Sequence, residues 1–151
     1  MIILLGWRCL LSTSEIKIEK ILSANDVGKT NSHQAGFLIP SHLVKMNLFP
    51  TLEDKELNPR LLVNLLDLKN SYEYVVNYIK YNNRKFGGTR YEYRLTGVLD
   101  LIRHNSLRAG DSIFFRPINF DSFSVSFLHR SHKSWDTSSQ GWTVREGESD
   151  G

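Results

Sequence analysis

The chain has 151 residues, of which 40% are hydrophobic and 23% charged, and it carries a formal net charge of +3. This size and composition predict one soluble globular domain whose core needs no disulfide. Cys9 is the single cysteine, which excludes an internal disulfide and a cysteine-based zinc site and is typical of a reducing cytoplasm.

The opening segment 1–11, MIILLGWRCLL, is apolar but interrupted by Arg8. It is too short to span a bilayer, and it lacks the basic start and the cleavage site of a signal peptide. We therefore expect a short helix or strand that packs on the domain.

Segment 15–22, EIKIEKIL, alternates isoleucines with charged residues and predicts a half-buried strand. The polar stretch 23–34 follows, and its turn-forming residues predict a loop of about a dozen residues. Segment 35–40, AGFLIP, predicts a short strand that ends at Pro40.

Segment 41–49 predicts a short helix capped by Ser41, with Leu43, Val44 and Leu48 on one face. The apolar runs 60–68 and 72–81 are separated by three polar residues and predict a β-hairpin.

Segment 91–95 predicts a further strand, and 97–105 a second helix that Thr96 could cap. Segments 107–120 and 122–130 predict a turn and two more strands, the last with one serine-rich face. Many short strands, two short helices and no βαβ alternation predict a mostly β (α+β) barrel or sandwich.

Segment 131–151 is rich in serine, glycine and charge, and predicts a linker or tail after a folded domain of residues 1–130. Trp135 and Trp142 could hold part of this segment against the domain. A linker in this place suggests one module of a longer protein.

Positive charge is concentrated in segment 80–94, which has five basic residues and one acid. Such a cluster favours contact with a polyanion. In an extended chain Arg90, Glu92 and Arg94 project to the same side. Arginine can bind guanine O6 and N7 while a carboxylate accepts from cytosine N4, so the triplet suggests recognition of bases. A surface row of salt bridges is the alternative interpretation.

Two loops offer groups suited to nucleic acid. Gly87 and Gly88 permit close approach to a partner or a simple hairpin turn. In the first loop Lys29–Gln34 supplies donors and acceptors for phosphates and base edges, although such a loop can also be a solvated connector. Its six members are Lys29, Thr30, Asn31, Ser32, His33 and Gln34.

A catalytic alternative remains open. Glu56, Asp67 and Lys69 have the residue types that hold a metal ion in many nucleases. The same types occur by chance in any charged sequence, and Asp67 also suits the end of a strand. The chain contains no phosphate-binding glycine loop, no nucleophile elbow and no metalloprotease or CxxC motif.

The motifs LSANDVGKTNSHQAGFLIP, ELNP, YNNRKFGGTRYEYRLTG and LRAGDSIFF resemble the amino-terminal effector-binding domain of EcoRII-type restriction endonucleases, whose fold is that of plant B3 transcription-factor domains. The resemblance runs from about Glu15 to Arg130. It implies a seven-stranded B3-like DNA-binding pseudobarrel with two short helices, in which two arms grip the major groove of double-stranded DNA.

Transferred by position, the resemblance implies arms at about Lys29–Gln34 and Arg84–Arg94, with His33 in the first. The implied contacts of the second arm are Arg84, Lys85, Arg90, Tyr91, Glu92, Tyr93 and Arg94. It further implies a bacterial cytoplasmic protein and a site of the CC(A/T)GG type, with no catalysis, metal or cofactor in this domain and a nuclease domain after Gly151. A transcription-factor-like regulator is a third possibility.

Three positions depart from the family pattern. Gly88 stands where the relative has lysine, Tyr93 where it has another basic residue, and Leu38 where it has an aromatic residue. The first two changes remove positive charges, which would weaken phosphate contacts or alter the preferred site.

Overall fold

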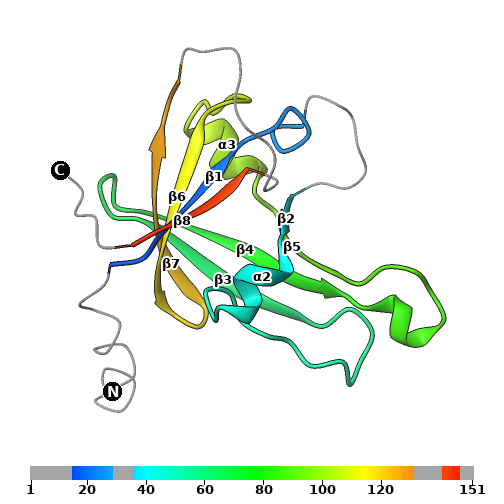
Figure 1. Cartoon of the computed structure of the whole chain (residues 1–151). Helices are drawn as coiled ribbons and strands as arrows, with labels where there is room; N and C mark the ends of the chain where they lie inside the picture. Colours follow the sequence, from blue (N-terminus) through cyan, green and yellow to red (C-terminus); the bar gives the residue numbers. More distant parts are fainter. Residues whose placement is uncertain (1–14, 29–35, 131–140, 147–151) are drawn as a thin grey trace.

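The computed structural model describes residues 15–28, 36–130 and 141–146 (Figure 1). The predicted segments 1–11 and 29–34, and Trp135, lie outside these residues. No helix within the described part is long and apolar enough to cross a membrane.

Eight strands and three short helices make up this part. In chain order they are β1 (Lys17–Ile21), β2 (Phe37–Ile39), α2 (Ser41–Lys45), β3 (Arg60–Asp67), β4 (Tyr72–Tyr81), the 3₁₀ helix η1 (Asn83–Phe86), β5 (Glu92–Thr96), α3 (Leu99–His104), β6 (Ser112–Asn119), β7 (Ser122–Leu128) and β8 (Trp142–Arg145). The mostly β fold and the two short α-helices are as predicted.

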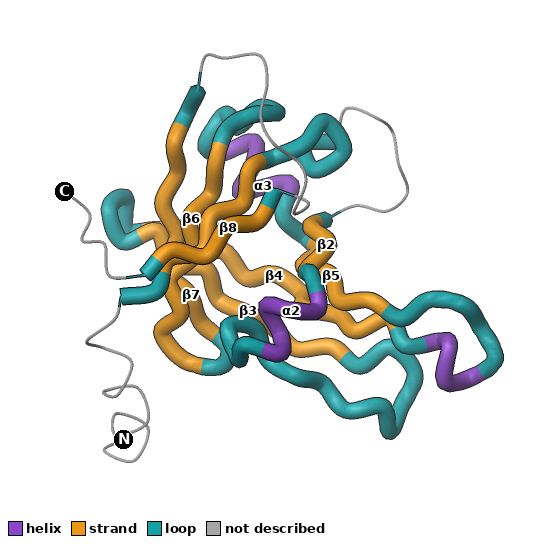
Figure 2. The backbone as a smooth tube through the Cα atoms, viewed as in Figure 1, coloured by secondary structure: helices purple, strands orange, loops and turns teal. Residues whose placement is uncertain are grey.

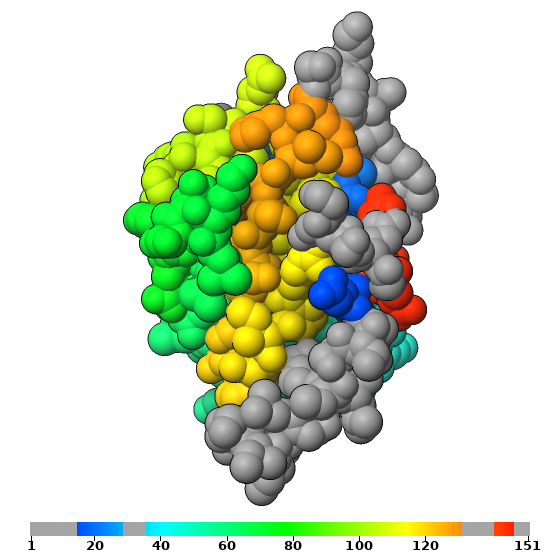
Figure 3. Space-filling model, turned by 90° about the vertical axis from the view of Figure 1, so that its left-hand side faces the viewer, coloured from blue at the N-terminus to red at the C-terminus, as the bar shows by residue number. Residues whose placement is uncertain are grey.

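The strands form one sheet in the order β2-β5-β4-β3-β7-β6-β1-β8. Its two four-stranded halves are antiparallel and meet at β3 and β7, the one parallel pair among the described strands. Figure 3 shows β7 and β6 running down one face of the molecule, between the β3–β4 hairpin and strands β1 and β8. The sheet curls into a half-barrel with eight strands instead of the expected seven.

The alternation of side chains in the β3–β4 hairpin sets which face is buried. Val63 and Leu65 of β3 and Val76 and Tyr78 of β4 are at most 1% exposed, whereas Leu62, which precedes Val63, is 61% exposed. This is the period-two pattern of strands with one face against a core. The predicted hairpin is confirmed.

Phe49 lies at the centre of an aromatic cluster in the core. Its ring is 4.9 Å from Phe123, 5.9 Å from Tyr78 and 5.9 Å from Trp142. Each such pair adds about 0.5–1.5 kcal/mol beyond the burial of its area. The cluster joins β4, β7 and β8, and so holds together strands from both halves of the sheet.

Two charged side chains of β1, those of Glu19 and Lys20, are buried, which differs from the half-exposed strand that the sequence predicts. Glu19 is 2% exposed and Lys20 5%. Glu19 accepts from Ser112 Oγ at 2.7 Å and pairs with Arg130 and Arg145, each at 2.9 Å. Burial alone would raise the pKa of Glu19, but these hydrogen bonds hold it below the usual value.

Both predicted helix caps are wrong. The residue that caps α2 is Pro40, and the one that caps α3 is Val98, and neither makes a side-chain capping hydrogen bond. Ser41 is the first residue of α2, and Thr96 is the last residue of β5. Short helices of this kind are held by buried leucines such as Leu43 and Leu101 instead.

Strand β8 extends the sheet beyond residue 130, into the segment for which the sequence predicts a linker. It pairs antiparallel with β1, and Trp142 is 3% exposed. The prediction that Trp142 packs on the barrel is therefore confirmed. The strand brings the C-terminal part of the described chain to the second edge of the sheet, opposite β2.

Candidate nucleic-acid interface

Residues 82–91 form an extension, here called the second arm, that projects beyond the ends of β4 and β5 (Figure 2). The N–H of Arg84 donates to the oxygen of Arg90 at 2.9 Å, and the N–H of Gly88 donates to the oxygen of Asn83 at 2.7 Å. Gly87 adopts the left-handed conformation that glycine favours, with φ 95°. The second arm is therefore a folded hairpin end, held by its own backbone.

Asn83 braces this arm from within. Its Oδ1 accepts the N–H of Arg90 at 2.6 Å. A Cβ at Gly88 would lie 2.7 Å from the Asn83 side chain, so any other residue there would have to displace it. Gly88 is the position at which the resemblance expects lysine. In this chain the absence of a side chain at Gly88 leaves room for the Asn83 side chain to bind the N–H of Arg90.

Arg90, Glu92 and Arg94 lie together on one side, as the alternation of a strand predicts. Oε2 of Glu92 accepts from Arg90 Nη2 at 2.9 Å and from Arg94 Nε at 2.5 Å. Burial would raise the pKa of Glu92, but the two arginines hold it below the usual value. The row of salt bridges is thus present in the free protein, and Glu92 is an anion at neutral pH.

The three side chains differ in exposure. Arg90 is 34% exposed, Glu92 28% and Arg94 only 9%. The Arg90 guanidinium also lies 4.0 Å from the ring centre of Tyr81, an arrangement that limits its freedom. Arg90 and Glu92 can thus meet a partner at the surface, whereas Arg94 lies beneath them.

Three basic side chains lie close to the ring of Tyr91. Its ring centre is 4.7 Å from Lys80 Nζ, 5.5 Å from Arg84 Cζ and 5.8 Å from Lys85 Nζ. Arg84 and Lys85 are exposed and Tyr91 is 39% exposed. These side chains form a positively charged surface to which a phosphate backbone could bind.

Tyr93 is a core residue and does not join this surface. It is 8% exposed, stacks on Tyr78 at 5.3 Å, and its hydroxyl oxygen accepts the N–H of Leu52 at 3.2 Å. Alternation explains the difference, because residue 93 faces the opposite side of β5 from 92 and 94.

The first arm, for which Lys29, Thr30, Asn31, Ser32, His33 and Gln34 are predicted, lies outside the described residues. Its flanking glycines are described, and both have positive φ, 83° at Gly28 and 95° at Gly36. A Cβ at Gly36 would be 2.3 Å from the oxygen of Leu95, so only glycine fits beside β5 there. The chain therefore returns to the sheet beside Leu95 and Thr96, at the end of β5 away from the second arm.

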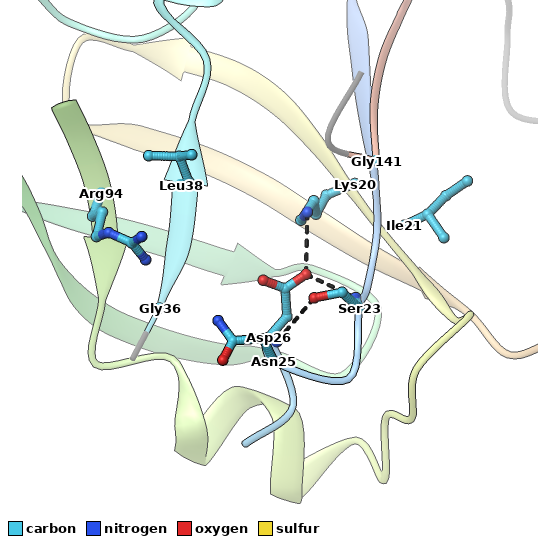
Figure 4. A pocket seen from close by; sticks show the side chains of 9 residues that line it. All are labelled: Lys20, Ile21, Ser23, Asn25, Asp26, Gly36, Leu38, Arg94 and Gly141. Carbon is cyan, nitrogen blue, oxygen red and sulfur yellow. Dashed lines mark hydrogen bonds and ion pairs between the residues drawn. The ribbon is translucent and has the colours of Figure 1, made fainter. Parts of the chain in front are cut away.

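A pocket of about 270 Å³ lies at this point, between β1 and β2 (Figure 4). Arg94 enters it from β5, and Lys20 and Asp26 form an ion pair of 3.1 Å on its β1 side. Asp26 also accepts the N–H of Ser23 at 2.8 Å, while Ser23 Oγ accepts the N–H of Asp26 at 3.1 Å. These reciprocal bonds fix the chain that leads to residue 29.

The structure also shows contacts that the sequence patterns did not identify. Asn82, Lys80 and Asp54 connect the second arm to loop 53–59, with Asp54 Oδ1 3.0 Å from Lys80 Nζ. The hydrogen bond from Asn82, followed by those from Lys80 and Tyr91, lowers the pKa of Asp54 to about 2. The ELNP motif lies in this loop, and it was the one sequence signal that could have drawn attention there.

The alternative metal-dependent site is not assembled. Glu56 is exposed in the loop before β3, whereas Asp67 is the last residue of that strand, about 23 Å from its first residue at 3.3 Å per residue. Asp67 accepts from the main chain and side chain of Asn70 at 3.2 and 2.8 Å, with the exposed Lys69 in the same turn. Within the described ranges no group of three or more His, Cys, Asp or Glu residues could hold a metal ion.

Comparison with known proteins gives three findings. The family model for the N-terminal domain of restriction endonuclease EcoRII matches residues 12–102. The type II restriction enzyme EcoRII of Escherichia coli is 42% identical over 104 residues, which are 68% of this chain and 26% of that enzyme. The chain therefore spans about a quarter of the length of this curated relative.

Solved structures with the same fold include three DNA-binding or restriction-enzyme domains. The Arabidopsis FUS3–DNA complex has a TM-score of 0.55 at 20% identity, and the match covers 75% of this chain and 96% of the chain in that structure. The B3 domain of UbaLAI restriction endonuclease with cognate DNA has 0.51 at 16%, covering 88% and 87%. The N-terminal domain of Helicobacter pylori LlaJI.R1 has 0.51 at 14%, covering 89% and 99%.

Proposed function

Because this chain belongs to the family of EcoRII restriction endonuclease N-terminal domains, we propose that it binds double-stranded DNA sequence-specifically through two arms in the major groove. The observation that carries the proposal is the position of Glu92, an anion held between Arg90 and Arg94 at the base of an exposed basic arm. A surface that bound only phosphates would gain nothing from an acid in this position, because the carboxylate repels phosphate groups.

The geometry of Glu92 suits the recognition of a base pair. Both arginines bond to Oε2, and no described residue donates to Oε1, which leaves that oxygen to accept a cytosine N4 amino hydrogen. Arg90 uses one N–H on Glu92, and its remaining N–H groups can bind the O6 and N7 of guanine. Each such contact gives about 1–3 kcal/mol of discrimination between bases.

The exposed cations would supply affinity that does not depend on sequence. Arg84 and Lys85 lie beside Tyr91 at the outer part of the second arm, where they can neutralise phosphates and release counterions. Lys29 and His33, with the other residues of the first arm, would contact the opposite side of the groove.

The catalytic step belongs to another part of such an enzyme in this proposal. The relative is about four times as long as the matched region, so a nuclease domain joined to this one would cleave the DNA. The domain itself would act without a metal or cofactor, as an effector or target-recognition module of a bacterial restriction–modification system in the cytoplasm.

Competition binding at fixed salt, without divalent metal, tests the proposal. A CC(A/T)GG duplex competes with the same duplex carrying one inverted inner C·G pair. We expect a preference of about a hundredfold, or 2.7 kcal/mol. Equal affinity for these two duplexes, and no enriched sequence in a selection from random duplexes, would contradict the proposal.

A further inference from the structure

Asn82 is a polar residue with 0% exposure at the point where the chain enters the second arm. Its Nδ2 donates to Asp54 Oδ1 at 3.1 Å and to the oxygen of Glu56 at 2.9 Å. Its Oδ1 accepts the N–H of Asn58 at 2.8 Å, and its own N–H donates to Asn58 Oδ1 at 3.3 Å. The side-chain amide is thus fully used in binding loop 53–59.

Asp54 connects this loop to both ends of the second arm. Its Oδ1 accepts from Asn82 at the entry, and its Oδ2 accepts from the Tyr91 hydroxyl at the exit, at 2.9 Å. Lys80 Nζ also pairs with Oδ1 of Asp54, and it donates to the main-chain oxygen of Leu52 at 3.1 Å. One carboxylate therefore contacts both ends of the arm, beside the β4–β5 pairing of Tyr81 with Glu92.

The loop itself is a poor surface for DNA. It carries Glu53, Asp54 and Glu56 against a single basic residue, Lys55, which pairs with Glu53 at 3.2 Å. A polyanion would be repelled by this charge. The loop can therefore favour DNA binding only indirectly, by holding the arm.

Holding the arm has a direct effect on affinity. A loop that is ordered before binding loses less conformational entropy when its partner arrives. Removing the Asn82 amide would leave Asp54 Oδ1, the oxygen of Glu56 and the N–H of Asn58 without this partner, and the arm would lose its connection to loop 53–59.

We propose that Asn82 and Asp54 are positioning residues, which hold residues 82–91 in the DNA-binding conformation before DNA is present. This inference rests on the proposed function. It adds loop 53–59 to the recognition machinery, in a role that acts through the arm and needs no contact of the loop with a base or phosphate.

The test compares Asn82→Ala and Asp54→Asn with the wild type and with Asn105→Ala. Asn105 donates from its side chain to Tyr74 and Leu101 near α3, away from the arm, so its variant measures general loss of stability. Hydrogen exchange in the free protein follows the N–H groups of Arg84, Gly88 and Arg90, which are bonded within the arm. The same samples are titrated with the preferred duplex and with a random duplex.

We expect these three amides to exchange about tenfold faster or more in both arm variants, since their opening would no longer be opposed by the loop. Affinity for the preferred duplex should fall about tenfold, with affinity for random DNA within about twofold of wild type. Asn105→Ala should lower the melting temperature and change neither the exchange of the arm amides nor the affinity for the two duplexes. Asp54→Asn, which keeps the shape and is partly exposed, serves if Asn82→Ala does not fold.

Unchanged exchange of the arm amides, or unchanged preference for the duplex, would overturn the positioning role while leaving the proposed function intact. Equal loss of affinity for both duplexes would also overturn it, since the long side chains of Arg84 and Lys85 can still reach phosphates from a loosened arm, whereas the base contacts of Arg90 need a fixed one. A wild-type protein without any sequence preference would instead overturn the proposed function and this inference together.

Discussion

The indole nitrogen of Trp142 donates a hydrogen bond to the main-chain oxygen of Leu38 at 3.0 Å. The two residues belong to β8 and β2, which are the opposite edges of the sheet. Leu38 is also in register with Arg94 of β5. A residue near the end of the described chain thus connects the two edges of the sheet, beside Arg94 of the candidate site.

This closure predicts the effect of changing Trp142. Trp142→Phe should keep much of the packing and lose the hydrogen bond, at a cost of about 1 kcal/mol in the free energy of unfolding. Trp142→Ala should cost about 3–5 kcal/mol. Urea denaturation measures both, with Leu62→Ala at an exposed position expected within about 0.5 kcal/mol of wild type. Similar stability of Trp142→Ala and wild type would show that the closure contributes little.

Arg90→Ala should lower affinity for the preferred duplex by about 1–3 kcal/mol and relax the choice of base at one position. Affinity for random DNA should change much less, because other cations remain. The control is Lys85→Ala, which should weaken all duplexes about equally and reduce the salt dependence of binding. Titrations at two or more salt concentrations separate the two behaviours, and equal losses for both duplexes in Arg90→Ala would rule out base recognition by this residue.

Arg94→Ala should differ from Arg90→Ala because Arg94 is buried and bonded to Glu92. It should lower the free energy of unfolding by about 1–3 kcal/mol as well as the preference among duplexes. Arg90→Ala, which removes a more exposed partner, should cost at most about 1 kcal/mol of stability. Measuring denaturation and binding on the same two variants checks this, and equal stability of the two would show that the burial of Arg94 is not important.

Stability should fall in acid. The pKa of Asp54 is lowered to about 2, and those of Glu92 and Asp111 are also lowered. A carboxyl whose folded pKa lies below its unfolded value stabilises the protein above the unfolded value, about 4, and this contribution disappears as pH falls toward the folded pKa. The contribution of these three carboxyls to the free energy of unfolding should therefore be constant above about pH 5. It should decline as the pH falls from 4 to 2.

Asp54→Asn isolates one of these contributions. The variant should be less stable than wild type at neutral pH, and the difference between them should narrow as pH falls from 4 to 2. Denaturation curves across this range measure it. A difference that stays constant would mean that the Asp54 charge does not stabilise the folded state.

The sequence predicts best what local alternation determines. The β3–β4 hairpin follows from its apolar pattern, and the grouping of Arg90, Glu92 and Arg94 follows from the same period. That period also explains why Tyr93 faces the core, so its burial could have been foreseen. Family resemblance, rather than local pattern, was needed to expect a DNA-binding pseudobarrel.

Features that depend on partners distant in the chain were not predictable in this way. Glu19 is buried because Arg130 and Arg145, more than 100 residues later, neutralise it. Strand β8 has only four residues in a polar segment, and it forms because the edge of β1 is available for pairing. Asn82 gives no periodic signal, since its bonds reach loop 53–59 across the fold.

The connection of Asn82 to loop 53–59 determines how specificity could be transplanted between relatives. Residues 82–91 could be exchanged as one segment if only the backbone mattered, because Tyr81 and Glu92 are paired across β4 and β5 on either side of them. Loop 53–59, which binds Asn82, however lies about 25 residues earlier in the chain. On the proposed positioning role, a functional chimera has to exchange residues 53–59 together with residues 82–91, two segments that are separate in the gene.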